Sequence, residues 1–154
     1  MFDTVLVAGL GLMGGSMAKT IKARTLSRVL GWNRTRATAE QALADGSIDA
    51  IATDALFREV DLVIIGLYPQ ATVDWLLENM PKMKKGCVIV DMVGVKQFMV
   101  DHLEQAALDA GVHYVGGHPM AGREFSGLDY ALPTLFDGAS MIFVPTRSSS
   151  ERIL

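Results

Sequence analysis

The sequence predicts an α/β fold in which helices cover both faces of a doubly wound, mostly parallel sheet. Short apolar or β-branched runs alternate with helical patterns from residue 4 to residue 115, the order that βαβ units require. The run at 61–66 is apolar almost throughout, as expected for a strand that is covered on both faces. A glycine-rich segment at 9–14 separates the first strand from the first helix.

The individual elements follow from this alternation. Strands are expected at 4–8, 28–32, 50–53, 61–66, 86–91, 112–115 and 140–144. The first helix should turn Met13, Met17 and Ile21 toward the sheet, because residues four apart share a helix face. Three further helices are expected, one through Ala39 and Leu43 to 45–46, one from Pro69 to Pro81, and one from Val95 to Gly111.

The segment 116–137 interrupts the alternation, because it is rich in glycine, proline and polar residues. A short helix is expected to start at Ser126, where Asp129 three residues on resembles a capping box, and Pro133 should kink or end this helix. The strand at 140–144 is then an extra C-terminal strand. We expect residues 1–147 to form one domain and residues 148–154 to begin a truncated helix or linker toward a second domain that is absent.

Composition excludes several classes of function. The 154 residues are 50% hydrophobic and carry 14 Lys and Arg against 17 Asp and Glu, a formal charge of -3. No basic block is present for nucleic acid or an anionic membrane surface. The single cysteine, Cys87, lies in an apolar run and is expected in the core. No leader pattern and no run of the ~20 apolar residues that span a bilayer is found. A cytoplasmic protein without a metal site is predicted.

The segment from Gly9 to Gly14 matches the G-x-G-x-x-G fingerprint of dinucleotide-binding Rossmann-type folds, in the required strand–turn–helix context. Gly9 would make the tight turn, Gly11 would let the backbone approach a pyrophosphate, and Gly14 would let the helix pack on the strand. The free N–H groups at the helix start would bind the phosphates. The intervening Leu12 and Met13 are therefore also expected in the cofactor site.

The end of the second strand favours NADP over NAD. An NAD site usually has an acidic residue there for the ribose 2′-hydroxyl, whereas this chain has Asn33, Arg34 and Thr35. A guanidinium can pair with a 2′-phosphate in a bidentate way, so Arg34 is the expected phosphate ligand, with Asn33 and Thr35 adding hydrogen bonds. The alternative is a solvated basic turn with no ligand.

Three more loops should emerge at the carboxyl edge of the sheet, where ligands bind in such folds. They are 66–69, 91–96 and 116–124. We expect cofactor contacts at the residues that open the first two loops, namely Leu67, Tyr68, Pro69 and Asp91. His118 lies among glycines in the third loop, and a neutral imidazole there could accept the proton of a carbinol that loses hydride. His102 and His113 have no such context and are expected to be structural or exposed.

The third loop makes a family resemblance specific. Gly-Gly-His-Pro-Met-Ala-Gly at 116–122, with Arg123-Glu124 after it, resembles the catalytic loop of prephenate and arogenate dehydrogenases. The segment 91–96 resembles that family's D-x-x-S-V-K motif, and 135–138 and 143–146 are similar to its tail. The resemblance implies oxidative decarboxylation of prephenate or arogenate in tyrosine biosynthesis, with hydride transfer to nicotinamide and His118 as the catalytic residue.

Lys96 and Glu124 match family positions, where they could serve the substrate or could be structural ion-pair members. The chain departs from the family pattern at two points. The first is Gly94, which replaces the family's serine, a residue that is expected to hold the substrate hydroxyl, the nicotinamide or the histidine. The second is the family's helical second domain, which dimerises and binds the substrate carboxylates and which is expected to be absent. A homodimer is possible and would normally form through that domain.

Two alternatives remain. A β-hydroxyacid-type NADP dehydrogenase would share the fold and the Asn-Arg-Thr sequence at 33–35, but it would lack the His-Pro-Met-Ala-Gly loop. A nucleotide-binding module or fragment without catalysis of its own would share the glycine fingerprint alone.

Overall fold

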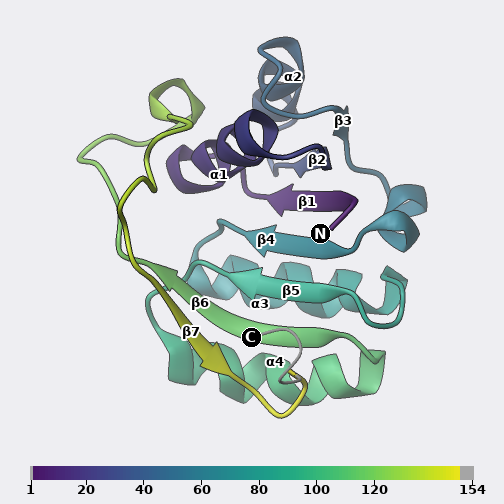
Figure 1. Ribbon diagram of the computed structural model, residues 1–154. Coiled ribbons are helices and arrows are strands. Elements are labelled where there is room, and N and C mark those ends of the chain that lie inside the picture. Colours follow the sequence, from purple (N-terminus) through teal and green to yellow (C-terminus); the bar gives the residue numbers. More distant parts are fainter. Residues whose placement is uncertain (1, 150–154) are drawn as a thin grey trace.

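A computed structural model describes residues 2–149 and contains one seven-stranded sheet, in the order β3-β2-β1-β4-β5-β6-β7. The strands and helices alternate along the chain as the sequence predicts, and the doubly wound α/β fold is confirmed (Figure 1). The strands are β1 Thr4–Ala8, β2 Arg28–Trp32, β3 Ala50–Ile51, β4 Leu62–Ile65, β5 Val88–Asp91, β6 His113–Pro119 and β7 Met141–Pro145.

Helices pack on both faces of this sheet. In Figure 1, α1 and α2 lie on the face over β1 and β2, and α3 and α4 lie on the opposite face. The α-helices are α1 Leu12–Arg24, α2 Arg36–Ala44, α3 Pro69–Asn79 and α4 Lys96–Ala110, and the 3-10 helices are η1 Asp54–Glu59, η2 Met80–Lys82 and η3 Leu128–Tyr130. Strands β1 to β6 are parallel to their neighbours, so their carboxyl ends lie at one edge.

Alternating strand residues supply two hydrophobic cores. Leu6, Ile65 and Ile89 point into the larger core, which is completed by α3 and α4, and Val7 and Val29 point into the smaller core beneath α1 and α2. Cys87 is fully buried in the larger core, as predicted, and burial raises the pKa of its thiol to about 12. A thiol with such a pKa stays protonated at neutral pH and is a poor nucleophile.

The last two strands differ from the sequence-based expectation. The predicted strand at 112–115 extends to Pro119, because β7 returns antiparallel to β6 and pairs His118 with Ile142. His118 therefore lies within a strand and not in a loop beyond it. Local sequence patterns around residues 116–119 do not predict this pairing with β7, since the paired residues lie more than twenty positions apart in the chain.

Two helix expectations are also corrected. The helix expected from Ser126 is a single 3-10 turn at Leu128–Tyr130, preceded by Gly127 with a positive φ of 96° that interrupts a helical path. On α1, Met13 and Met17 are only half-buried, because the small residues Gly14 and Ala18 form the buried face and bring the helix close to the strands. The helix start expected after Ser148 falls on residues 150–154, which lie outside the described residues.

No helix in the described part of the chain is long and apolar enough to cross a membrane.

The packing of α4 can be tested by a pair of leucine substitutions. Leu103 is fully buried and Leu108 is 39% exposed on the same helix. We expect Leu103→Ala to lower the free energy of unfolding by ~2–5 kcal/mol, since it leaves a cavity in the larger core. Leu108→Ala, the matched control, should cost less than ~1 kcal/mol in the same urea titration. Equal losses would contradict the assigned face of α4.

Candidate active site

The glycine fingerprint forms a tight junction between β1, β4 and α1. Gly9 has a positive φ of 89°, and its N–H donates to the carbonyl of Trp32 at 2.8 Å. A Cβ on Gly14 would lie 1.8 Å from the Gly9 carbonyl oxygen, so no side chain fits between helix and turn. A Cβ on Gly66 would lie 3.1 Å from that same oxygen. The three backbones thus meet at distances that only glycines allow.

The start of α1 is suited to bind an anion. Gly11 is its N-cap residue, no side chain caps the helix, and α1 has 13 residues. The first N–H groups and the positive end of the helix dipole are therefore available to a phosphate. A Cβ on Gly11 would meet no atom within 4 Å, which leaves open space beside these N–H groups. This open space fits the close approach of a pyrophosphate.

A cavity of about 480 Å³ extends from this helix start along the carboxyl edge of the sheet. Among the residues predicted for the cofactor, it is lined by Gly9, Gly11, Asn33, Arg34, Thr35, Leu67 and Tyr68. The structure thus brings together the loops after β1, β2 and β4. Other predicted residues do not line it. Leu12 and Gly14 are buried in the helix base, Met13 is half-buried, and Pro69 is the first residue of α3.

Sequence reasoning missed the opposite wall of this cavity, which comes from β2 and α3. Ala71, Trp75 and Glu78 line the cavity at helical spacing, together with Asp74 and Trp32. The two tryptophan rings pack at 5.4 Å between centroids. The spacing of Ala71, Trp75 and Glu78 is a usable signal in retrospect, because it places them on one face of the helix that follows the β4 loop.

Among the residues that the structure describes, Arg34 is the only cation that lines the cavity. It is exposed and makes no ion pair or hydrogen bond with other residues of the 2–149 segment, whereas the neighbouring Arg36 pairs with Glu40 at 2.8 Å. Asn33 has a structural role, since its Oδ1 accepts the Leu10 N–H at 2.9 Å and so ties the end of β2 to the fingerprint turn. The Arg34 guanidinium therefore remains available to a ligand, whereas the Asn33 amide is already hydrogen-bonded within the protein.

A second group of predicted residues gathers beside this region, around His118 on β6. Gly94, in the loop after β5, lies against the imidazole, since a Cβ built on it would be 3.5 Å from Cε1 and 3.9 Å from Nδ1 of His118. The His118 side chain is half-buried, and its Nδ1 is closed off from solvent without a hydrogen-bond partner in the described residues. The loop after β5 and the strand β6 therefore meet at the imidazole.

The carboxylate of Asp91 holds the Gly94 loop in place from below. It is fully buried and accepts hydrogen bonds from the Val93 N–H at 2.8 Å, from the Tyr114 hydroxyl at 2.6 Å and from the Lys96 ammonium. These three donors come from the protein itself, so the Asp91 side chain supports the loop. Tyr114 was missed by the sequence analysis because it reads simply as a strand residue.

Burial governs the charges in this network. Burial lowers the pKa of Lys96, and the adjacent Asp91 carboxylate opposes that shift. Burial and the same carboxylate raise the pKa of Tyr114, which therefore remains a neutral donor. A Cβ on Gly116 would lie 3.0 Å from Cδ of Lys96, so the lysine stem passes directly over this glycine of β6. Lys96 is thus an ion-pair member whose ammonium is directed to Asp91.

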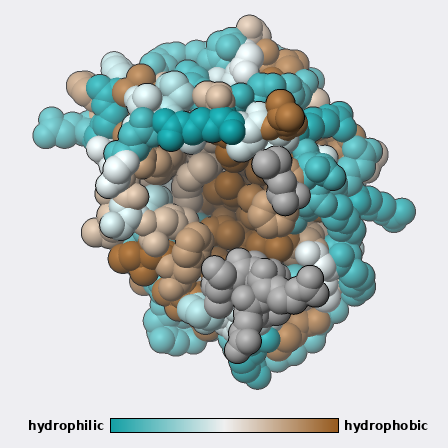
Figure 2. All heavy atoms as spheres, in the orientation of Figure 1, coloured by the Kyte–Doolittle hydropathy of each residue, from teal (hydrophilic) through white to brown (hydrophobic). Residues whose placement is uncertain are grey.

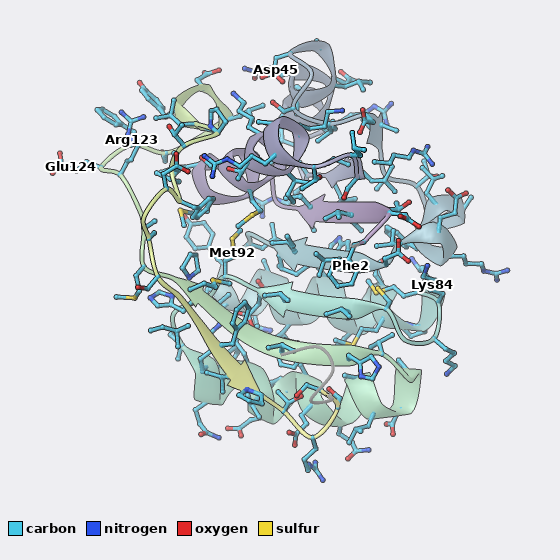
Figure 3. The ribbon with its side chains drawn as sticks, in the orientation of Figure 1. Phe2, Asp45, Lys84, Met92, Arg123 and Glu124 are labelled. Carbon is cyan, nitrogen blue, oxygen red and sulfur yellow. The ribbon has the colours of Figure 1, made fainter. Side chains whose placement is uncertain are left out.

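Glu124 is not brought to these groups. It is exposed on the long loop after β6, and Figure 3 shows it at the tip of that loop, directed away from the sheet. The other two histidines have local roles, as predicted. Nδ1 of His102 lies 2.8 Å from the Phe98 carbonyl oxygen, and Nδ1 of His113 lies 2.6 Å from that of Ser148.

A separate apolar cavity of about 310 Å³ lies on the sheet face opposite α3 and α4. Figure 2 shows the hollow, surrounded by hydrophobic side chains. Leu62, Ile64, Val88, Val90 and Val115 form its floor on β4, β5 and β6. It contains none of the predicted site residues.

The fold and the 480 Å³ cavity at the carboxyl edge of the sheet define a class of protein. This class is the Rossmann-type nucleotide-binding domain, here with a histidine at the same edge. The comparison with protein families identifies the family. The family model for the prephenate dehydrogenase nucleotide-binding domain matches residues 17–154, and the chain belongs to that family.

Individual relatives agree with this assignment. The chain is 35% identical to the prephenate dehydrogenase of Bacillus subtilis over 156 residues, which cover 99% of this chain and 42% of that protein. It superposes with a TM-score of 0.88 and 26% identity on the prephenate dehydrogenase of A. aeolicus in complex with hydroxyphenyl propionate and NAD+, and with 0.86 and 25% on the Synechocystis arogenate dehydrogenase. These alignments cover 99% and 97% of this chain but only 54% and 52% of the two structures.

The fingerprint geometry predicts that one alanine substitution lowers stability and that another weakens cofactor binding. Gly14→Ala should lower the free energy of unfolding by ~1–3 kcal/mol, because its Cβ collides with the Gly9 carbonyl. Gly11→Ala should change it by less than ~0.5 kcal/mol, because its Cβ enters open space. Gly11→Ala should instead weaken the binding of a nicotinamide dinucleotide about tenfold or more, since the methyl occupies the expected phosphate approach. Chemical denaturation and calorimetric titration measure the two effects, and unaltered dinucleotide affinity in Gly11→Ala would contradict the expected phosphate site.

Proposed function

We propose that this chain is the cofactor-binding domain, with the catalytic histidine, of an enzyme that oxidatively decarboxylates prephenate or arogenate. The observation that carries the proposal is His118, whose imidazole lies at the carboxyl edge of the sheet against the loop after β5. The family membership and the names of the prephenate and arogenate dehydrogenase relatives support the reaction. The chain spans about half or less of those relatives, so the activity belongs to the whole enzyme.

The residues of the chain would divide the chemistry as follows. A nicotinamide bound in the cavity would supply the acceptor for the hydride that leaves the ring carbon bearing the substrate hydroxyl. His118 accepts the hydroxyl proton as the C–O bond gains double-bond character. The bond between the ring and its carboxylate would then break, and carbon dioxide would leave. The electron pair of that bond stays in the ring and makes it aromatic. The proton held by His118 returns to the oxygen, which gives the phenol.

The network below the imidazole would keep this geometry during turnover. Asp91 fixes the loop that carries Gly94, and Lys96 and Tyr114 neutralise and hold the carboxylate. We assign Lys96 and Asp91 as positioning residues on this basis. Binding of the substrate carboxylates and formation of a homodimer would fall to the part of the enzyme that the relatives have beyond this chain.

NADP is the cofactor that we propose. Arg34 is an exposed guanidinium that lines the cavity and has no ion-pair partner among residues 2–149, so it can bind a 2′-phosphate. No carboxylate stands at 33–35, the place where an NAD site usually has one. The two acidic residues of the cavity, Asp74 and Glu78, come from α3.

Arg34→Ala tests the cofactor assignment. Loss of a charge-assisted hydrogen bond costs ~1.5–3 kcal/mol, so we expect NADP affinity to fall roughly ten- to a hundredfold and NAD affinity to change little. Arg36→Ala is the matched control, because Arg36 is paired with Glu40 and does not line the cavity. Calorimetric titration of both cofactors gives the readout. An equal loss for NADP and NAD in Arg34→Ala would refute the assignment.

His118→Asn tests the catalytic role. In the form of the enzyme that turns over prephenate or arogenate, the rate of cofactor reduction should fall by ~10²–10⁴, the range of general acid–base contributions. NADP affinity should be retained, since the imidazole does not line the cofactor cavity. His102→Asn is the control, because the exposed His102 forms its hydrogen bond within α4, to the Phe98 carbonyl oxygen. A nearly unchanged rate in His118→Asn would remove His118 from the mechanism.

A further inference from the structure

The polar side chains of the 480 Å³ cavity are divided between two walls. The wall at the end of β2 carries Arg34, with Asn33 and Thr35 beside it, whereas the wall on α3 carries Asp74 and Glu78. These two acidic residues are four positions apart and so lie on one face of the helix. One wall is therefore cationic and the other acidic, and different parts of a ligand must face them.

The acidic wall on α3 is suited to the base of a dinucleotide and not to its phosphates. Carboxylates repel phosphate, so the phosphates of the proposed cofactor would lie at the start of α1 and at Arg34. Adenine is bonded to C1′ of the ribose, next to the C2′ that carries the phosphate of NADP. A phosphate at Arg34 therefore leaves the base in the same cavity, where Trp32, Leu67 and Trp75 offer apolar surface for an aromatic ring.

Asp74 is the carboxylate of this wall with acceptor capacity to spare. Its Oδ1 accepts a hydrogen bond from Nε2 of Gln70 at 2.8 Å, and no ion pair joins Asp74 to a cation of residues 2–149. Glu78, in contrast, lies 3.9 Å from the ammonium of Lys82, and its side chain is 73% exposed. A carboxylate has about four lone-pair sites and no donor. Asp74 can therefore bind only a ligand group that donates a hydrogen bond.

We propose that Asp74 selects adenine as the base of the cofactor, by accepting a hydrogen bond from the exocyclic amino group. Adenine carries this donor at N6. Hypoxanthine has the same ring system with a carbonyl oxygen at that position, and a carboxylate repels such an acceptor. Asp74 is then the residue that determines base specificity, and Arg34 is the residue that binds the 2′-phosphate. The inference rests on the proposed cofactor site.

A ratio of two dissociation constants tests the role of Asp74. Calorimetric titration gives the Kd of NADP and the Kd of its analogue with hypoxanthine in place of adenine, two ligands that differ in the base alone. We expect the unsubstituted chain to bind the analogue about fivefold or more weakly, a moderate ratio because Asp74 is exposed to solvent. In Asp74→Asn the side-chain amide can donate as well as accept, so the ratio should fall to about one.

Two further substitutions separate this effect from the loss of a negative charge. Asp109→Asn is the matched control, because Asp109 accepts from Nε2 of Gln105 at 2.9 Å, one turn earlier on α4, and does not line the cavity. Glu78→Gln removes the other carboxylate of the α3 wall. Both variants should keep the ratio of the unsubstituted chain. A loss in either that equals the loss in Asp74→Asn would overturn the assignment to Asp74.

The same titrations with NAD and its hypoxanthine analogue make the test independent of the 2′-phosphate. A ratio near one in the unsubstituted chain, for both pairs of ligands, would overturn the proposal even if a variant failed to fold. The proposed function would stand in that case, because the dinucleotides still bind. An unchanged ratio in Asp74→Asn would also overturn the proposal. Failure of all four dinucleotides to bind would refute the cofactor site and, with it, both the base selection and the proposed function.

Discussion

The close contact of three backbones at Gly9, Gly14 and Gly66 is the constraint on which the nucleotide site depends. Helix α1 can begin directly against the end of β1 because Gly14 has no side chain. A Cβ at this position would lie 1.8 Å from the Gly9 carbonyl oxygen. The first N–H groups of α1 consequently point to the carboxyl edge of the sheet, where the cavity lies. The Asn33 amide completes the junction by binding the Leu10 N–H. One backbone contact thus determines both the packing of the helix and the place of the proposed phosphate site.

A different kind of interaction organises the region of His118. Asp91 is a fully buried carboxylate, and it is tolerated because three donors from the loop, from α4 and from β6 satisfy it. The consequence is that β5, β6 and the start of α4 share one polar anchor beneath Gly94. Substitution of a single partner would leave a buried charge incompletely satisfied and would disturb the loop that touches the imidazole.

Much of the candidate site was predictable from the sequence, for an identifiable reason. In a parallel sheet the loops after successive strands meet at one edge, so residues after β1, β2 and β4 could be placed together without coordinates. The cavity wall formed by Trp32 and Trp75 was missed because apolar residues at helical spacing predict a core as readily as a ligand site. Glu124 was grouped with His118 because it matches a position of the family pattern, but the loop that carries it leads away from the sheet (Figure 3).

The sequence by itself determined the alternation of strands and helices, the fingerprint turn and the family, because these depend on residues that are neighbours along the chain. Only the tertiary structure decided that β7 pairs with β6 and that the hydroxyl of Tyr114 meets Asp91. It also decided that Gly94 faces the unpartnered Nδ1 of His118. These are contacts between segments that are distant in sequence, and their geometry depends on how the sheet and helices pack together.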